Sequence, residues 1–244
     1  MSDEIVFENV PTDKLLTLLG PVAGLGAMTD ILVKIETDLV SLRVVDPAHV
    51  AMLSADWTVH TGQTVDICID YGEAMNALRL FDGEDVRLII GGGSVTVKGE
   101  HGRRTIPLND LGMASVPSKF PEFDLPVSVL TTVSDLRNSL KCVAGLSDHL
   151  TIDTGITGDG PHMIIKTATD RTSAEFEVSK PSISDKGGDG AVASYPWDYF
   201  SNIVKSLTDG DLVMSYATDY PLMFLTDRDD IQTEVLIAPR IESE

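Results

Sequence analysis

The sequence VAGL at residues 22–25 returns at residues 143–146, which is 121 residues further along the chain. Each copy ends a stretch with helical apolar periodicity and comes just before a segment rich in β-branched residues. A second pair of segments, residues 69–86 and 195–212, lies 126 residues apart, and each contains a strand end, an amphipathic helix, an acidic turn with glycine and a new strand. Two features in the same order at nearly the same spacing predict two domains of like topology.

The composition is that of a folded globular protein, because 43% of the 244 residues are hydrophobic and 23% are charged. The two cysteines, Cys68 and Cys142, form neither a disulfide framework nor a zinc motif, so we expect a reducing compartment. The N-terminus carries acid where a signal peptide needs base, and the longest apolar stretch, residues 15–28, is too short to cross a bilayer. We therefore expect a cytoplasmic protein that is neither secreted nor inserted in a membrane.

The charge balance is strongly acidic, with 18 basic and 38 acidic residues and a net charge of −20. This balance counts against a protein that attracts nucleic acid by its overall field. A local basic face remains possible, because charges further apart than about 8–10 Å are largely screened at physiological salt.

The middle of the chain reads as a linker. Residues 109–126 contain Gly112, Pro117, Pro121 and Pro126, a composition that neither continues a helix nor pairs well in a sheet. On both sides lie short β-branched runs separated by turn residues, at 30–35, 39–45, 86–90, 162–168, 174–178 and 233–237. Each half is therefore predicted to be mostly strand with two helices, an α+β protein.

Four helices are predicted, each with one apolar and one polar face, at residues 12–20, 71–81, 134–144 and 196–207. Their polar faces carry five cations, Lys14, Arg79, Arg137, Lys141 and Lys205. Their four acids, Asp13, Glu73, Asp135 and Asp198, are all near helix starts. One interpretation is an ordinary solvated face, since Lys and Arg are good helix formers and acids suit helix N-termini. The other is a cationic side on an acidic molecule.

No motif for catalysis, metal binding or a cofactor is apparent. The run Gly91–Ser94 lacks the lysine of a phosphate loop and is predicted to be a turn between strands. The five histidines have no metal-ligand spacing, and no nucleophile elbow occurs. The acidic turns at Asp82 and Asp209 lack the EF-hand pattern and are predicted to be solvated hairpin corners. We therefore expect no metal, no cofactor and no enzymatic activity.

Two motifs resemble a known family. The sequence DPAHV at residues 46–50 follows LRVV at 42–45, and LIAPRIE occupies residues 236–242. Together they resemble the DNA sliding clamp of archaea and eukaryotes, proliferating cell nuclear antigen. Further similar stretches are SDHL at 147–150 and TDYPL at 218–222, so the resemblance covers nearly the whole chain.

The resemblance implies a fold, an assembly and a function. Two clamp domains, residues 1–111 and 127–244, would be joined by a connecting loop at 112–126, with antiparallel sheets outside and two helices of each domain lining a pore. Three copies would close into a homotrimeric ring around double-stranded DNA, bound without sequence preference, in the cytoplasm at the nucleoid, or in the nucleus of a eukaryote. The pore-lining cations would be Lys14, Arg79, Arg137, Lys141 and Lys205. A heterotrimer subunit and, from another class, an acidic hydrolase are the alternatives.

The resemblance also implies a surface for partner enzymes. DNA polymerase, the clamp loader, flap endonuclease and DNA ligase would bind it through a short peptide with a glutamine and aromatic residues. The matching positions are Val45, Asp46, His49, Pro221, Leu236, Ala238 and Pro239, with Val116 or Phe120 from the linker. For Val45 and Leu236 taken singly, an ordinary core position is the competing interpretation.

Ring closure would pair residues 102–108 of one copy with residues 172–178 of the next. Opposite charges, on Arg103 and Arg104 against Glu175 and Glu177, would favour this pairing, with Ile106 and Phe176 adding apolar contact. The alternative is that these charged residues face solvent on unpaired edges. The chain departs from the family at Pro21, where the first helix is expected to end after Gly20, and this departure weighs against Lys14 as a pore residue.

Overall fold

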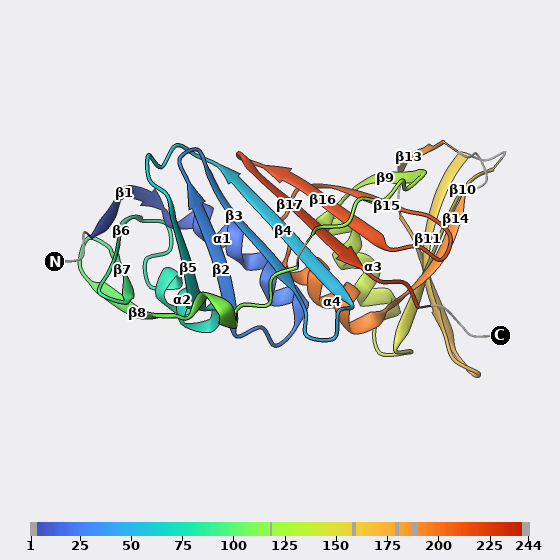
Figure 1. Ribbon diagram of the computed structural model, residues 1–244. Helices are drawn as coiled ribbons and strands as arrows, with labels where there is room; N and C mark the ends of the chain where they lie inside the picture. The colour runs from blue at the N-terminus through green and yellow to red at the C-terminus, as the bar shows by residue number, and fades with distance from the viewer. Residues whose placement is uncertain (1–3, 118, 158–159, 179–180, 187–189, 241–244) are drawn as a thin grey trace.

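The computed structural model describes residues 4–117, 119–157, 160–178, 181–186 and 190–240. Ile241 and Glu242 of the C-terminal motif lie outside the described residues. Figure 1 shows an elongated molecule in which the helices lie along one face of the central strands. The helices are α1 (Thr12–Leu19), α2 (Tyr71–Arg79), α3 (Val133–Val143) and α4 (Trp197–Ser206), with 3-10 turns η1 (Gly20–Leu25) and η2 (Leu111–Met113).

Strands make up most of each half. Those of the first half are β1 (Ile5–Pro11), β2 (Asp30–Glu36), β3 (Leu39–Val45), β4 (Ala51–Thr58), β5 (Val65–Asp70), β6 (Asp85–Gly91), β7 (Ser94–Lys98) and β8 (Arg103–Asn109). Those of the second half are β9 (Val127–Thr132), β10 (His149–Thr157), β11 (Gly160–Ala168), β12 (Ser173–Glu177), β13 (Ser182–Asp185), β14 (Ala191–Pro196), β15 (Asp211–Tyr216), β16 (Leu222–Arg228) and β17 (Ile231–Ile237).

The two halves repeat one arrangement of strands. The first half pairs its strands in the orders β1-β6-β7-β8 and β5-β2-β3-β4, and the second in the orders β9-β15-β16-β17 and β14-β10-β11-β12. Strand β13, which pairs with β9, is an addition to the second half. Strands β4 and β17 pair antiparallel from Ala51↔Ile237 to Trp57↔Ile231, so one continuous sheet crosses from one half to the other.

Local sequence explains where the helices begin and end. The Asp70 carboxylate accepts the Glu73 backbone N–H at the start of α2, and the Thr132 hydroxyl accepts that of Asp135 at the start of α3. The predicted end of the first helix near Pro21 is confirmed, because α1 stops at Leu19 and the chain continues as the 3-10 turn η1.

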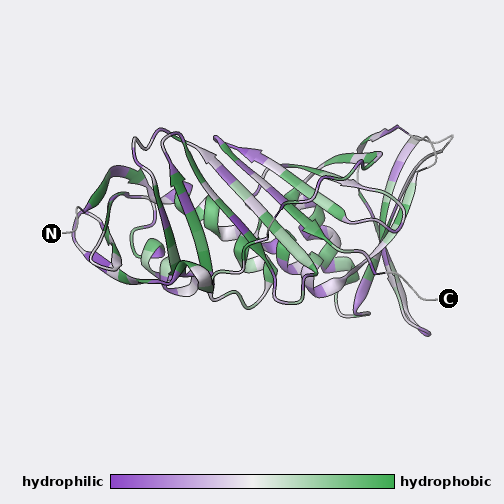
Figure 2. Ribbon diagram, viewed as in Figure 1, coloured by the Kyte–Doolittle hydropathy of each residue, from purple (hydrophilic) through white to green (hydrophobic). Residues whose placement is uncertain are grey.

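The helices pack their predicted apolar faces against the sheets. Phe200, Ile203 and Val204 of α4 are fully buried, as is Leu136 of α3. Figure 2 shows hydrophilic residues interspersed among hydrophobic ones on the central strands, and along β4 the alternate residues Leu53, Ala55 and Trp57 are buried. One layer of apolar side chains between helices and strands therefore forms the core of both halves.

The helices of the two halves also meet each other. Gly24 of η1 lies against α4 so closely that an added Cβ would be 2.6 Å from the Ile203 Cα atom. The first VAGL copy therefore packs a 3-10 turn on the helix of the other half. The second copy ends α3 at Val143 and turns at Gly145, whose φ is 77°.

Two local predictions need correction. Asp82 and Asp209 lie in connections from a helix to a strand and not at hairpin corners, because β6 and β15 follow directly on α2 and α4. The segment predicted as a linker is also not free of structure, because β8 reaches Asn109 and η2 follows, where the Asp110 side chain accepts the Gly112 N–H. The hairpin turn predicted at Gly91–Ser94 is confirmed, with Gly92 and Gly93 at φ 59° and 74°.

Candidate functional site

Three of the five predicted pore cations are exposed on the polar faces of the helices. They are Arg79 of α2, Lys141 of α3 and Lys205 of α4. Lys141 Nζ donates a hydrogen bond to Asn138 Oδ1 at 3.0 Å, within its own helix. All three guanidinium or ammonium groups are therefore accessible to a phosphate.

Arg137 has a different setting. Its guanidinium donates hydrogen bonds to the carbonyl oxygens of Val204, Lys205 and Leu207 at the C-terminal end of α4. It also forms an ion pair with the Asp209 carboxylate, and its side chain is 31% exposed. A cation at the negative end of a helix dipole stabilises that end. Arg137 thus joins α3 to α4, and its contact with DNA stays a prediction.

Lys14 is also engaged within the chain. Its ammonium donates to the Asp229 carbonyl oxygen and lies 3.9 Å from the Asp229 carboxylate, in the turn between β16 and β17. Its side chain is 28% exposed. Lys14 therefore links α1 to the second half, and its place in a pore stays a prediction.

An apolar row runs across the face of the sheet that points away from the helices. Strand register places Val45 opposite Met52, Met52 opposite Leu236, and Leu236 opposite Met223. Directly opposite residues point to the same face, so these four side chains form one row across β3, β4, β17 and β16. Two residues further along the strands, the equivalent row is polar or mixed, with Arg43, Ser54, Glu234 and Leu225.

Exposure divides the members of this row. Val45 and Leu236 are each only 4% exposed, whereas Met52 and Met223 are half-buried. The sequence prediction named the two buried residues and missed the two methionines. Neither methionine lies in the motifs that carry the resemblance, and only the strand register reveals that all four residues lie in one row. We call Val45, Met52, Leu236 and Met223 the apolar row.

Asp46 organises the loop beside the apolar row. Its buried carboxylate accepts the backbone N–H groups of Ala48, Val50 and Ala51 at 2.9, 2.7 and 2.6 Å, and the Tyr199 hydroxyl of α4 at 2.7 Å. Burial, and then the hydrogen bond to Asp46, raise the pKa of Tyr199 to about 12. With 1% of its surface exposed, Asp46 shapes the loop and is itself closed to contact from outside.

The loop holds His49 toward solvent. His49 is exposed, and its φ of 57° is a left-handed conformation. Its backbone N–H donates a hydrogen bond to the Asp46 carbonyl oxygen. Its imidazole is thus accessible at the rim of the apolar row.

The linker and the C-terminal segment reach the same end of the sheet. The Val45 N–H donates to Ser115 O of the linker at 3.3 Å, and the Ala238 N–H donates to Val50 O at 2.8 Å. Val116 is 38% exposed, and Phe120 is half-buried. Pro221, Ala238 and Pro239 are half-buried. In Figure 1 the linker crosses the strands on the face opposite the helices.

The C-terminal segment is tethered by charge. The Arg240 guanidinium lies 2.8 Å from the Asp148 carboxylate, and the Arg240 N–H donates to Ser194 O at 2.7 Å. Hydrogen bonds from His149 and Arg240 lower the pKa of Asp148 to about 2. The structure thus brings the predicted partner-binding residues to one end of the central strands.

The predicted contact strands are both open on one side. Among the described residues, β12 pairs only with β11, and Arg103–Pro107 of β8 pair only with β7. Arg103, Glu175 and Glu177 are exposed, and Phe176 is half-buried.

Two residues of β8, Ile106 and Arg104, make contacts within their own half. Ile106 is 2% exposed and lies in the core of its own half, so it is not free to add apolar contact to another copy as predicted. Arg104 shares the face of Ile106, because side chains alternate along a strand, and its guanidinium lies 2.8 Å from the Glu73 carboxylate of α2.

Two kinds of feature are absent from the described residues. They hold no group of three or more His, Cys, Asp or Glu residues that could bind a metal ion. No helix among them is both long and apolar enough to cross a membrane.

Comparisons with known proteins agree with the geometry. No family model matches the chain. The DNA polymerase sliding clamp of Methanosarcina mazei is 28% identical over 235 residues, covering 91% of this chain and 94% of that protein. The one from Methanocella arvoryzae is 29% identical over 223 residues, covering 86% and 89%.

Solved structures share the whole fold. The A. fulgidus PCNA, determined with the C-terminal region of FEN-1 bound, superposes with a TM-score of 0.84 at 19% identity and covers 99% of both chains. The PCNA of Thermococcus kodakaraensis superposes with a TM-score of 0.82 at 18% identity, covering 97% of this chain and 99% of its own. The resemblance seen in the sequence is thereby confirmed: the chain has the PCNA fold and is similar along most of its length to the archaeal DNA polymerase sliding clamps.

Proposed function

We propose that this chain is a DNA sliding clamp. Copies of it close head to tail into a ring that encircles duplex DNA and holds DNA polymerase and other replication enzymes on the template. The observation that carries this proposal is the ladder between β4 and β17 inside the chain, together with the repeated strand order of the two halves.

The repeat relates an internal pairing to an external one. Strand β12 is the counterpart of β4, and β8 is the counterpart of β17, since each pair holds the same place in its half. Inside the chain β4 pairs with β17, and the equivalent strands β12 and β8 are left with open sides. Open strand edges favour pairing with another chain. Pairing of β8 in one copy with β12 in the next is a head-to-tail contact, which a rotation can close into a ring.

The internal ladder also supplies the register of the external one. Asp70 and Pro196 directly precede α2 and α4, so they hold the same place in the two halves. Following the strand register from Asp70 to β4, and from Pro196 to β12, makes Glu175 the counterpart of Ser54. The starts of β6 and β15 make Arg103 the counterpart of Glu234. Because Glu234 pairs with Ser54, Arg103 of one copy lies directly opposite Glu175 of the next. Of the four predicted charges, these two form the closest pair.

The domain division belongs to the same proposal. Residues 1–111 and 127–244 are the two clamp domains, and residues 112–126 connect them. The repeated strand order supports this division, because each range holds one full set of strands and two helices.

DNA and partner enzymes would use opposite faces of the sheet. Arg79, Lys141 and Lys205 project from the helix layer, where contact with phosphate positions a protein without reading sequence. The apolar row lies on the other face and suits the apolar and aromatic side chains of a short peptide. Polymerase, clamp loader, flap endonuclease and DNA ligase are its expected partners, and one structural relative was solved with a FEN-1 peptide region bound.

The decisive experiment compares circular with linear DNA. The clamp is loaded by an archaeal clamp loader on nicked circular DNA, and the bound protein is measured before and after the circle is cut once. A ring held by linkage leaves the linear ends, so the bound amount falls after cutting and polymerase processivity falls with it. Equal retention before and after cutting contradicts the proposal.

The molecular mass in solution distinguishes a homotrimer from one subunit of a heterotrimer. A homotrimer has three times the chain mass of 26.3 kDa, or 78.9 kDa, whereas a subunit of a heterotrimer stays at 26.3 kDa until its partners are added. Turnover of model esters, phosphodiesters or peptides by the purified chain would instead favour an acidic hydrolase.

A further inference from the structure

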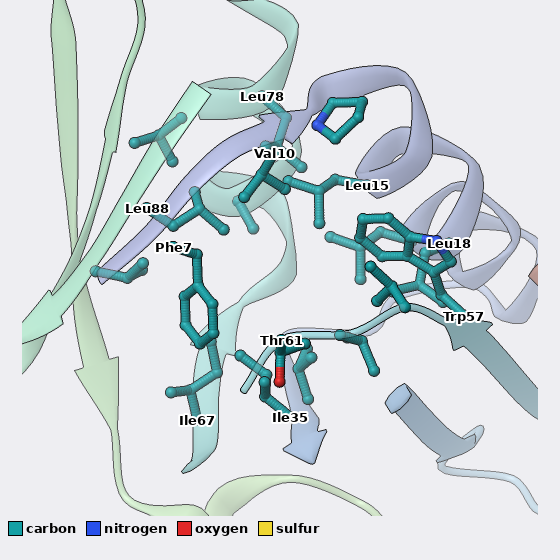
Figure 3. Close-up of a pocket in the computed structure, with 18 of the residues that line it drawn as sticks. Phe7, Val10, Leu15, Leu18, Ile35, Trp57, Thr61, Ile67, Leu78 and Leu88 are labelled. Atoms are coloured by element: carbon teal, nitrogen blue, oxygen red, sulfur yellow. The ribbon is translucent and has the colours of Figure 1, made fainter. Parts of the chain in front are cut away.

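An apolar cavity of about 340 Å³ lies in the core of the first half. Figure 3 shows its walls: Phe7 and Val10 of β1, Leu15 and Leu18 of α1, Trp57 of β4 and Leu88 of β6 surround one space. Among the lining residues, polar side chains occur only at Glu8, Asn9, His60 and Thr61. Apolar cavities of about 150 Å³ stay dry and bind benzene or xenon, so this one has room for an organic molecule.

The repeat of the two halves shows what the cavity lacks. In the second half the core contains four fully buried rings, those of Tyr195, Phe200, Tyr216 and Phe224. Phe200 and Phe224 are in contact, with ring centroids 5.5 Å apart, and the rings of Tyr195 and Tyr216 meet edge to face at 6.5 Å. Packed aromatic rings therefore fill this part of the second half.

The first half has smaller, aliphatic residues at the positions that correspond to these four rings. Tyr195 directly precedes Pro196 at the start of α4, and Ile69 directly precedes Asp70 at the start of α2. Counting four residues on from those starts, Phe200 corresponds to Ala74.

The strand register gives the other two counterparts. Phe224 pairs with Met214 and Val97 pairs with Leu88, so Phe224 corresponds to Val97. Counted from the first residues of β15 and β6, Tyr216 corresponds to Ile90.

The missing rings and the cavity coincide. Ile69, Ala74 and Val97 all line the cavity, so the space that aromatic rings occupy in the second half is open in the first. The register that matches Ser54 with Glu175 also matches Trp57 with Val178, and the starts of α1 and α3 match Leu18 with Ser139. Trp57 and Leu18 are larger than these counterparts, and they fill only part of the space.

The mouth of the cavity defines what can enter. Phe7, Val10 and Val59 are half-buried, and β1 shifts register between Phe7 and Val10, which opens the strand locally. His60 Nδ1 is 2.6 Å from Asp38 Oδ1, and Thr61 Oγ1 donates to Glu36 O at 2.6 Å, so these polar groups are already paired. Glu8 is ion-paired with Arg87 at 2.9 Å, and the lining residues include no lysine or arginine that could hold the carboxylate of a fatty acid.

We propose that this cavity is a binding site for a small, uncharged aromatic molecule of one or two rings, which takes the place of the side-chain rings that pack the second half. None of the residues that line the cavity belongs to the apolar row or is one of the three exposed cations. The proposal is therefore independent of ring assembly and DNA binding.

The test uses benzene and xenon with the full-length chain. At about five times its dissociation constant, benzene is expected to raise the melting temperature by about 2–4 °C. Crystals pressurised with xenon are expected to show density between Phe7, Leu15 and Trp57. An unchanged melting temperature together with no xenon density in the cavity would overturn the proposal.

Matched variants test the location of the site. Val97→Phe restores the ring that Phe224 supplies in the second half, and Ala74→Leu is a smaller filling that guards against a misfolded variant. Both are expected to abolish the benzene effect. Phe200→Ala, which opens the matching space in the second half, is expected to add a second benzene site and serves as the positive control. A benzene effect that persists in both filled variants contradicts binding in this cavity.

Discussion

At the scale of single residues, Asp46 shows how one buried carboxylate shapes a surface. It holds three backbone N–H groups and the Tyr199 hydroxyl, and so fixes the loop that borders the apolar row. The sequence marked Asp46 as a residue of the partner surface. It could not show the contact with Tyr199, because the two residues are 153 positions apart and no local pattern links them.

Replacing Asp46 by Ala is expected to lower the free energy of unfolding by about 2–4 kcal/mol, because buried donors lose a charged acceptor. Urea denaturation measures this change. Asp46→Asn retains the shape and one acceptor oxygen and is expected to cost less than Asp46→Ala. A parent-like denaturation midpoint for Asp46→Ala would show that water replaces the carboxylate without cost.

Tyr199 gives this contact a pH dependence. The folded state raises the Tyr199 pKa from 10 to about 12, so the folded state holds the phenolic proton more tightly than the unfolded state does. The stability from this group is complete below pH 10 and is lost as the pH rises from 10 to about 12. Tyr199→Phe is expected to lose less stability than the parent in that window, measured by urea denaturation at several pH values. The same decline in both proteins would contradict this account.

At the scale of elements, periodicity predicted the helices to within about two residues, because an amphipathic face is a local property of the sequence. The strand partners were beyond such reasoning, since β4 and β17 come from opposite halves of the chain. The same limit explains the missed methionines of the apolar row. The acidic turns were misjudged because turn residues between a helix and a strand resemble those of hairpins.

The apolar row predicts where a partner peptide binds. Met52→Asp combined with Met223→Asp places charge on the two accessible members of the row, so we expect at least a thirtyfold loss in affinity for a glutamine and aromatic peptide. Isothermal titration measures it. Leu236→Asp is a poor substitute because Leu236 is buried, and its effect would include unfolding. Gln232→Asp, two rows away on β17, is the matched control and should bind as the parent does.

The open edges predict a charge-dependent assembly. Arg103→Glu places two acids opposite each other across the ladder. We expect the ring to dissociate at a protein concentration up to about fivefold higher than for the parent, in line with ~0–1 kcal/mol for an exposed pair. Adding Glu175→Arg should restore the parent value, as measured by light scattering during dilution. Arg104→Glu is the control, because Arg104 pairs with Glu73 inside the chain. Equal effects of Arg103→Glu and Arg104→Glu would contradict the proposed register.

At the scale of the whole molecule, an acidic chain carries exposed cations on its helices. The net charge of −20 conceals three exposed cations on the helix layer, and composition alone could not place them together. The helical wheels suggested the arrangement, but two of the five cations proved to be engaged by the Asp229 and Asp209 turns. Those contacts depend on tertiary folding and leave no signature in a helical wheel.

The three exposed cations predict how DNA binding depends on salt. Replacing Arg79, Lys141 and Lys205 by Ala removes phosphate contacts, so affinity for duplex DNA should fall and its dependence on salt concentration should become shallower. Fluorescence anisotropy over a range of salt concentrations measures both. Arg137→Ala should chiefly lower the melting temperature, because Arg137 anchors the end of α4. If the triple variant shows the same salt dependence as the parent, these cations are ordinary solvated residues that do not contact DNA.

The ladder between β4 and β17 also has a consequence for biosynthesis. Among the described residues β17 is the last strand, and it covers the β4 edge of the four strands β5-β2-β3-β4, which all belong to the first half. While the ribosome is still making the second half, β4 therefore waits with an uncovered edge, which is a hazard for aggregation. Contacts between such distant strands also slow folding. The edge of β4 stays unpaired until β17 emerges from the ribosome. A chaperone that shields β4 during translation would therefore raise the yield of folded protein.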